Sequence, residues 1–318
     1  MATSHRLATA ALATFLSACA ATSGQHPRNS SVPPPAVGRN EASTAGASAT
    51  TPIARRSGFA VAPDGTHIYY EVCGAGPAIV FVHGLGGNHA VWFQQVAHFA
   101  KDHTVVTLSQ RGFAPSGGDG RHYDPALLVR DLEAVMDAAS VTRATVVGQS
   151  MGGWTALGLA MKTPDRVAAL VLADTTGGID DDVIAAHMRE VTAAASRLRG
   201  TPPPLGVHPA LSPGFSARRP DLAYLYQTLT TFGSPPPDVI AGQLAAARVL
   251  PAALERFGVP TLFVVGAGDK LFPPSLVRRA AGYIKDSVVA EIGDAGHSPY
   301  FERPDAWNAA VSRFVDRP

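Results

Sequence analysis

Short, uninterrupted apolar segments alternate with helix-like segments from residue 58 to the end of the chain. The segment 78–82 (AIVFV) is bounded by glycine and proline, which is typical of a strand buried on both faces. Similar segments lie at 103–108, 144–147, 167–172, 262–265 and 288–292, and helical spacing separates them at 124–139, 151–162, 274–284 and 304–315. This alternation predicts an α/β fold, with a mostly parallel central sheet flanked by helices.

Two features modify that alternating pattern. Near the start, residues 59–61 and 67–72 flank Pro63-Asp64-Gly65, which predicts a β-hairpin. Residues 177–256 contain no convincing strand, several helical segments and proline-rich joints at 202–204 and 235–237. We therefore expect a helical cap, inserted between the later strands of the sheet, that shapes a pocket and excludes water.

Composition excludes several functional classes. The 318 residues carry a formal net charge of +1 with no Lys/Arg-rich run, so no nucleic-acid partner is expected. The two cysteines, Cys19 and Cys73, allow at most one disulfide, and Cys73 lies in an apolar stretch that favours a small buried thiol. Because no CxxC or Cys/His ligand spacing is present, a structural metal site is unsupported.

The N-terminal segment predicts export. A polar start with His5 and Arg6 precedes a twelve-residue apolar run from 7 to 18, too short to span a bilayer as a mature helix but suited to a secretory signal. The run ends in Leu16-Ser17-Ala18-Cys19, which resembles the lipobox of bacterial lipoproteins. That resemblance implies a lipid anchor on Cys19 and a membrane-anchored protein of the bacterial cell envelope.

Two other interpretations of this segment remain open. Ala18-Cys19-Ala20 also fits a small-x-small cleavage site, which would release a periplasmic or secreted protein, and a cytosolic protein is the remaining alternative. Residues 20–56 are rich in Ser, Thr, Ala, Pro and Gly and cannot bury enough apolar surface to offset the entropy of ordering. We expect a signal segment at 1–19, a disordered tether at 20–56 and one domain at 57–318.

A candidate nucleophile lies between a buried strand and a helix. In the segment Gly148-Gln149-Ser150-Met151-Gly152, a sharp turn would lift the serine hydroxyl above the carboxyl edge of the sheet. Residues 148 and 152 must then be small because the backbone crowds them. The helix that follows aims backbone N–H groups at the point where an oxyanion would form. Alone, the five-residue pattern also fits an ordinary glycine-rich turn.

Three further segments complete a candidate site. The loop His83-Gly84-Leu85-Gly86-Gly87 follows an earlier buried strand and can turn a backbone N–H inward, and His83 itself is expected to brace that loop. Asp269 follows the strand at 262–265, where a carboxylate lies on the same sheet edge as Ser150, although it would also suit a turn or helix cap. His297 follows the last strand in a glycine-containing loop.

The order Ser150, Asp269, His297, together with the His-Gly loop and the GxSxG turn, resembles the α/β-hydrolase superfamily over nearly all of 58–318. The resemblance implies catalysis by those three side chains and an oxyanion hole built from the N–H groups of Leu85 and Met151. Arg111-Gly112-Phe113 and Trp92 further resemble the capped esterase, lactonase and C–C hydrolase branch. That branch often carries an acidic residue where this chain has Ser109-Gln110, and a small glycine turn where it has Ala114-Pro115.

The function expected from these residues is hydrolysis of a carboxylic ester or lactone through an acyl-enzyme, without metal or organic cofactor. A carboxylate at position 150 would have implied dehalogenase or epoxide-hydrolase chemistry. Amidase, perhydrolase and C–C hydrolase activities would use the same triad, and a ligand-binding sensor or an anchored structural protein with a vestigial site are rivals from other classes. The expected substrate is a small to medium apolar ester or lactone. The aromatic and leucine residues at 224–232 would either line its pocket or pack the cap. The sequence does not determine the oligomeric state.

Overall fold

The computed structural model describes residues 52–118, 124–197, 204, 206–232 and 237–316. The predicted signal segment with Cys19, and all of the predicted tether before residue 52, lie outside the described residues. The first strand begins at Arg55, two residues ahead of the boundary expected at 57. Within the residues described, no helix has both the length and the hydropathy needed to cross a membrane.

The core of the molecule is an eight-stranded sheet with the order β1-β2-β4-β3-β5-β6-β7-β8. Strands β1 and β2 form the predicted hairpin, β2 also pairs antiparallel with β4, and every other pairing is parallel. The mostly parallel α/β fold expected from the alternating segments is therefore confirmed. The strands are β1 (Arg55–Val61), β2 (His67–Cys73), β3 (Ala78–Val82), β4 (Thr104–Leu108), β5 (Ala144–Gln149), β6 (Val167–Ala173), β7 (Thr261–Gly266) and β8 (Val288–Ile292).

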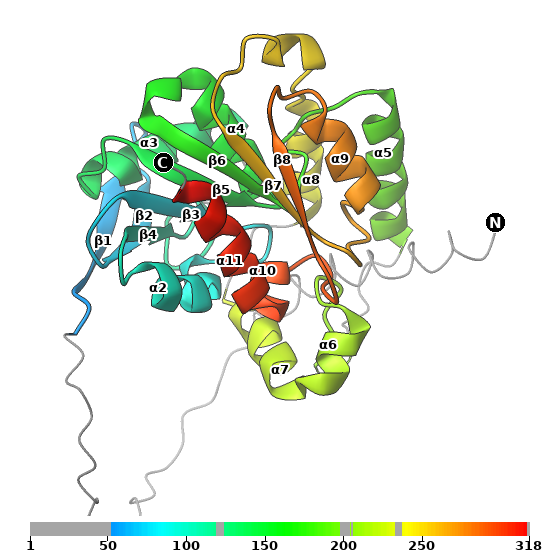
Figure 1. The fold of residues 1–318 in the computed structure, drawn as a ribbon, viewed down its shortest axis with the longest axis horizontal. Helices are drawn as coiled ribbons and strands as arrows, with labels where there is room; N and C mark the ends of the chain where they lie inside the picture. The colour runs from blue at the N-terminus through cyan, green and yellow to red at the C-terminus, as the bar shows by residue number, and fades with distance from the viewer. Residues whose placement is uncertain (1–51, 119–123, 198–203, 205, 233–236, 317–318) are drawn as a thin grey trace, which may run out of the picture.

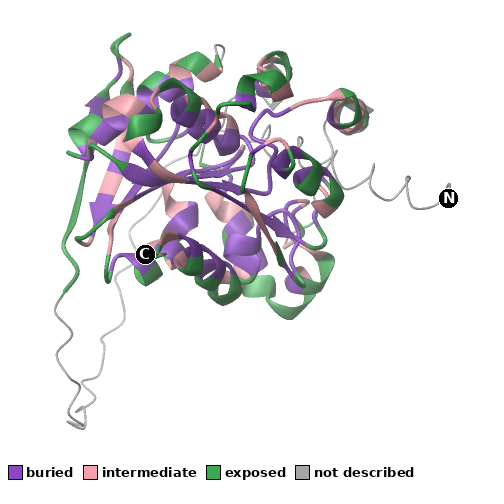
Figure 2. Cartoon of the chain, turned by 45° about the horizontal axis from the view of Figure 1, so that its top comes forward, coloured by how far each residue is buried: buried purple, intermediate pink, exposed green. Residues whose placement is uncertain are grey.

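Helices cover both faces of this sheet (Figure 1). One face packs against α3 (Pro125–Ala138), α4 (Gly152–Lys162) and α9 (Pro274–Ala281), and the other against α2 (Phe93–Phe99), α10 (Pro299–Glu302) and α11 (Pro304–Val315). Strand β3 is apolar throughout because its alternate side chains enter both cores: Val80 and Val82 on the first face, Ile79 and Phe81 on the second. Figure 2 shows the buried sheet between these two helical layers.

The start of α3 lies where its sequence predicts, whereas α9 ends at Ala281, three residues before the expected end at 284. For α3, Asp124 accepts a hydrogen bond from the Ala126 N–H and Pro125 takes the first helical position, a favourable start for a helix. Its buried side chains Val129, Leu132, Val135 and Met136 recur at helical spacing and pack against the sheet. Cys73 is a free, buried thiol, as its apolar surroundings predict.

Among the described residues, four α-helices lie between β6 and β7, inside the segment where a cap was expected. They are α5 (Asp182–Arg197), α6 (Pro213–Arg218), α7 (Pro220–Leu229) and α8 (Pro237–Ala246). Figure 1 shows α5 and α8 near α9, whereas α6 and α7 lie beside α10. Ring contacts hold the latter pair, since Phe215 and Tyr226 both meet Phe301 edge to face. A single backbone bridge between Ile179 and Val249 closes the base of the segment.

Candidate active site

Ser150 occupies a strained turn between β5 and α4. Its φ of 50° lies in the left-handed region, which is uncommon for any residue other than glycine and marks a backbone held by its surroundings. The neighbouring glycines are required by space. A Cβ at Gly148 would lie 2.4 Å from the Gly152 carbonyl oxygen, and one at Gly152 would lie 2.4 Å from the Val82 carbonyl oxygen. The crowding anticipated at both positions is thus present.

Asp269 follows β7 in a tight turn and is held there by the backbone. Its Oδ1 accepts the N–H groups of Leu271 (2.8 Å) and Phe272 (3.1 Å), which fixes the rotamer of the carboxylate. The loop bearing His297 comes very close to this turn, because a Cβ at Gly266 would lie only 1.9 Å from the Gly296 carbonyl oxygen. Glycine at 266 therefore allows two loops at the sheet edge to meet.

The three predicted side chains meet in one chain of hydrogen bonds. His297 Nδ1 lies 2.8 Å from Asp269 Oδ2, and His297 Nε2 lies 2.9 Å from Ser150 Oγ. A carboxylate can only accept, so the imidazole proton belongs on Nδ1 and the lone pair on Nε2 faces the serine hydroxyl. All three residues are buried, with Ser150 9% exposed and the other two 3% exposed. Phe272 stacks on the imidazole and limits its rotation.

Further polar side chains hold the histidine loop, and no sequence pattern indicates them. Gln149, next to the serine, donates from Nε2 to the His297 carbonyl oxygen at 3.0 Å. Glu302 of α10 accepts the N–H of Gly296 at 2.7 Å through one oxygen and that of Ser212 at 2.8 Å through the other. Burial raises the pKa of Glu302 despite these hydrogen bonds. The histidine loop is thus joined to the nucleophile turn and to the segment between β6 and β7.

His83 braces the loop after β3, as expected, and does not face Ser150. Its Nδ1 donates to the Gly84 carbonyl oxygen (2.7 Å) and its Nε2 accepts the Gln110 N–H (2.9 Å). The Gln110 side chain returns a hydrogen bond to the His83 carbonyl oxygen and accepts one from Thr155 on α4. Complete burial lowers the pKa of His83 to about 4. Gln110 thus lies in the Ser109-Gln110 pair, where the capped esterase, lactonase and C–C hydrolase branch that this chain resembles often has an acidic residue.

The two residues whose N–H groups are expected to form an oxyanion hole line the same cavity as Ser150. Leu85 and Met151 both line the cavity with Ser150, and Met151 directly precedes the first turn of α4. Within the described part of the chain, neither N–H donates to a protein acceptor. Both are therefore free to bind an oxygen of a ligand.

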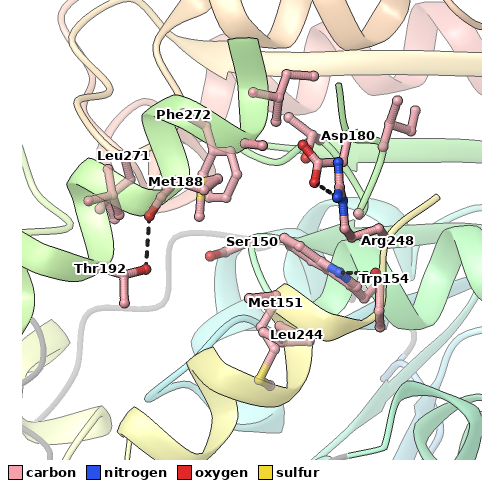
Figure 3. Close-up of a pocket in the computed structure, with 18 of the residues that line it drawn as sticks. Ser150, Met151, Trp154, Asp180, Met188, Thr192, Leu244, Arg248, Leu271 and Phe272 are labelled. Atoms are coloured by element: carbon pink, nitrogen blue, oxygen red, sulfur yellow. Dashed lines mark hydrogen bonds and ion pairs between the residues drawn. The ribbon is translucent and has the colours of Figure 1, made fainter. Parts of the chain in front are cut away.

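A largely apolar cavity of about 540 Å³ opens onto Ser150. Figure 3 shows Phe272 and Met188 on one side of the serine, with Met151 and Trp154 on the other. Residues of α5 and α8 form much of its wall, among them Ile184, Ile240 and Leu244. The charged groups at its border are Arg189 and the ion pair between Asp180 and Arg248. The Arg248 side chain is 45% exposed.

The alternative that residues 224–232 line this cavity is wrong. Tyr226 is buried and donates to or accepts from Ser298 at 2.8 Å, so it packs the base of the histidine loop. Tyr224, Leu225 and Phe232 are exposed, and none of them borders the cavity. The reason is that α7 packs on α10, whereas α5 and α8 lie over the serine.

One cluster of metal-ligand residue types occurs among the described residues: Asp174, Asp269 and His297, each with one donor atom within 4.8 Å of the others. Both imidazole nitrogens already hold hydrogen bonds, to Asp269 and to Ser150. The imidazole therefore has no lone pair to offer a metal without breaking the contact to the serine. The arrangement suits proton transfer from a hydroxyl to an imidazole that a buried, ionised carboxylate orients and stabilises.

Comparison with known proteins places this geometry in context. The family model described as alpha/beta hydrolase fold matches residues 77–304. A 3-oxoadipate enol-lactonase of Acinetobacter baylyi is 29% identical over 244 residues, which cover 76% of this chain and 89% of that protein. Among solved structures, an enol-lactonase from Burkholderia xenovorans is 25% identical with a TM-score of 0.67, covering 82% of this chain and 100% of the other. A thermophilic esterase from Thermogutta terrifontis matches with the same identity and TM-score, covering 82% of this chain and 98% of that one.

Proposed function

The chain belongs to the alpha/beta hydrolase fold family, and from that premise we propose that it is a serine hydrolase acting on carboxylic esters or lactones. One observation carries the proposal: Asp269, His297 and Ser150 form a continuous hydrogen-bonded chain whose serine end opens onto an apolar cavity. Lactonase and esterase neighbours at 25–29% identity support the same class of substrate.

Acylation begins when the Nε2 lone pair of His297 takes the proton of Ser150 as the hydroxyl oxygen attacks the substrate carbonyl. The Nδ1–H, held by Asp269 at 2.8 Å, keeps the imidazole in the tautomer that can accept this proton. The negative charge of Asp269 then stabilises the imidazolium. Because the side chain of Asp269 is fully buried, this charge is weakly screened.

The tetrahedral oxyanion is stabilised by the free N–H groups of Leu85 and Met151, each contributing about 3 kcal/mol to lowering the barrier. His297 next donates its proton to the leaving alkoxide, and the acyl group stays on Ser150. A water molecule activated by the same imidazole then attacks the acyl-enzyme and releases the acid. The leaving group of a lactone remains attached to the acyl chain, so its product is a hydroxy acid.

The cavity favours a small to medium apolar substrate. Its volume of about 540 Å³ is in the range of pockets that enclose a small organic molecule. Its walls are mainly aliphatic and aromatic, and the two arginines border it beside one acid, Asp180. An apolar acyl chain therefore gains burial in the interior, whereas a charged group placed there would lose hydration without a dedicated partner.

The first test is active-site labelling with a fluorophosphonate probe, followed by hydrolysis of p-nitrophenyl esters. We expect Ser150→Ala to abolish labelling and to lower kcat by about 10⁶-fold, the scale seen when a nucleophilic serine is removed. Ser140→Ala is a matched control, because Ser140 also has a left-handed φ but lies exposed at the end of α3. Unchanged labelling of Ser150→Ala would exclude the proposed nucleophile.

The second test separates the activities that share this triad. A panel of acyl esters, lactones, anilides and C–C substrates of equal acyl length should give the highest kcat/KM for esters or lactones. Rapid multiple turnover distinguishes an enzyme from a ligand-binding sensor, which would react once and retain its product. A preference for anilides or for C–C substrates above esters would replace the proposed substrate class.

We also propose that the protein is exported and anchored through a lipid on Cys19. The support is the apolar run at 7–18 followed by Leu16-Ser17-Ala18-Cys19. Cys19→Ser should move the protein from the membrane fraction to the soluble fraction in a bacterial host. An unchanged distribution would refute lipidation and favour cleavage by a general signal peptidase or cytosolic residence.

A further inference from the structure

A second buried carboxyl lies beside the triad and has no part in the mechanism above. Asp174 directly follows β6, is 0% exposed, and has a left-handed φ of 50°. Its N–H donates to the Val264 carbonyl oxygen and its Oδ1 accepts the Gly266 N–H at 2.9 Å. These two hydrogen bonds join it to the end of β7, the strand that carries Asp269.

The other oxygen of Asp174 lacks a donor. Oδ2 is fully buried and has no hydrogen-bond partner among the described residues when the group is treated as a carboxylate. A buried charge with an unsatisfied oxygen is costly, and a carboxyl group in that position is stabilised when it is protonated and donates instead.

Asp269 offers the acceptor that such a proton needs. Its Oδ1 accepts two backbone N–H groups and its Oδ2 accepts the Nδ1–H of His297, so the carboxylate is an ionised acceptor with a lone pair to spare. Side-chain oxygens of Asp174 and Asp269 lie within 4.8 Å of each other. Burial first, and then the negative charge of Asp269 and a hydrogen bond between the two side chains, raise the pKa of Asp174 well above its usual value.

We infer that Asp174 is a neutral carboxylic acid whose O–H donates to the carboxylate of Asp269, and that it acts as a positioning residue for the triad. The inference rests on the proposed function for its catalytic consequence alone. The hydrogen bond holds Asp269 ionised and oriented toward His297. A single negative charge then faces the imidazole, which matches the single positive charge that forms during catalysis.

Other titratable groups surround this pair and favour the neutral state. Besides Asp269 they are His297 from the loop after β8, Glu302 and Tyr300 from α10, and Tyr226 from α7. Glu302 adds to the repulsion on a second negative charge, and among the described residues no lysine or arginine forms an ion pair with Asp174. Ionisation of both aspartates would therefore place uncompensated negative charge in a region without water access.

The experiment compares Asp174→Asn with Asp174→Ala. Asparagine keeps an acceptor for the Gly266 N–H and a donor for Asp269 without a titrating group. We expect Asp174→Asn to keep kcat/KM within about threefold and to move the acid limb of its pH profile by less than about 0.3 unit, because the charge facing the imidazole is unchanged. Asp174→Ala removes the donor, and we expect a loss of about tenfold with the acid limb displaced to higher pH, because the negative charge of Asp269, without that hydrogen bond, stabilises the imidazolium more strongly.

Asp286 supplies a matched control. It also has a left-handed φ but is exposed and lies in the turn before β8, so Asp286→Ala reports the effect of alanine in that backbone conformation alone. A loss larger than about tenfold for Asp174→Asn, with the acid limb displaced to lower pH, would show that Asp174 is ionised and would overturn the inference. Unchanged kinetics in Asp174→Ala would overturn the positioning role.

A second measurement needs no substrate and separates this inference from the proposed function. The folded-state pKa of Asp174 is raised, so the folded protein holds a proton that the unfolded chain releases above about pH 4. Stability is therefore present at low pH and is lost as pH rises toward the folded pKa. In urea unfolding, the unfolding constant of the wild type relative to Asp174→Asn should rise with pH above about pH 4, with a slope approaching tenfold per pH unit, until the folded pKa is reached.

A ratio that stays constant with pH would mean that Asp174 is ionised in the folded protein, and would overturn the inference even if esterase activity is found. A rising ratio in a protein without esterase activity would retain the neutral carboxyl and reject the proposed function instead. The wild type should also show an infrared band of a protonated carboxyl at neutral pH that Asp174→Asn lacks.

Discussion

Replacing Asp269 with asparagine tests whether the carboxylate acts by fixing the imidazole tautomer. The Oδ1 position accepts two backbone N–H groups, from Leu271 and Phe272. An asparagine must keep its oxygen there, because the reverse orientation would point an amide N–H at two N–H donors and cost about 1–3 kcal/mol for each hydrogen bond lost. Its Nδ2 therefore takes the place of Oδ2, 2.8 Å from His297 Nδ1.

An amide donor at that place reverses the imidazole. His297 Nδ1 must then accept, so the proton moves to Nε2, which lies 2.9 Å from Ser150 Oγ and no longer offers a lone pair to the hydroxyl. We expect Asp269→Asn to lower kcat by about 10⁴-fold, the size reported for the same change in a serine protease, which corresponds to about 5 kcal/mol of barrier. The fold should survive, because the variant keeps both backbone hydrogen bonds.

The assay is steady-state hydrolysis of a p-nitrophenyl ester at neutral pH, with the rate of fluorophosphonate labelling as a second readout. Asp286→Asn is the control for the substitution itself at an exposed site. Because Asp174 lies beside the same histidine, the double variant Asp174→Asn/Asp269→Asn is measured as well. A loss below tenfold that persists in the double variant would refute the tautomer argument and the assignment of Asp269.

Two further predictions concern the loops around the site. Gly266→Ala should destabilise the protein by about 1–3 kcal/mol and displace the His297 loop, because its Cβ would meet the Gly296 carbonyl oxygen; urea unfolding and kcat/KM measure both effects, and Gly293→Ala, which has open space around it, should match the wild type. His83 has its pKa lowered to about 4 by burial, so the unfolded chain binds a proton that the folded protein refuses. The stability contributed by neutral His83 is present above about pH 6.5 and is lost as pH falls, so the unfolding constant should rise about tenfold per pH unit from about pH 6.5 down to about pH 4. His83→Asn should show a shallower slope, and equal slopes for the two proteins would contradict this.

The sequence was sufficient for the sheet because its central strands are buried on both faces. The segment Ala78–Val82 is apolar on both faces, and the strand bounds expected from the sequence are those found in the structure. The order of Ser150, Asp269 and His297 along the chain, each after a strand, was likewise enough to expect them on one edge of the sheet. Parallel strands bring their carboxyl ends together, so separation in sequence carries little information about separation in space.

The supporting groups could not be read in the same way. Gln110, Gln149 and Glu302 act through hydrogen bonds to main-chain atoms of distant loops, and such contacts leave no spacing or residue-type signature. Asp174 had one available signal, a carboxylate directly after a buried strand, the same argument that was applied to Asp269. The choice between pocket lining and packing for residues 224–232 stayed open for a related reason: amphipathic helices in an inserted segment have apolar faces whether they cover a pocket or another helix.

The arrangement of these contacts separates the parts of the protein that fix chemistry from those that fix substrate choice. Contacts to main-chain atoms of the loops after β5, β7 and β8 hold the triad in place. One is the close approach of Gly266 to Gly296, and another is the hydrogen bond from Gln149 to the His297 carbonyl oxygen. A side-chain change on α5 or α8, such as one at Met188 or Leu244, alters the cavity wall without touching those contacts. Substitutions in these two helices should therefore change relative kcat/KM among acyl chains, while the Ser150–His297 hydrogen bond and the labelling of Ser150 are retained.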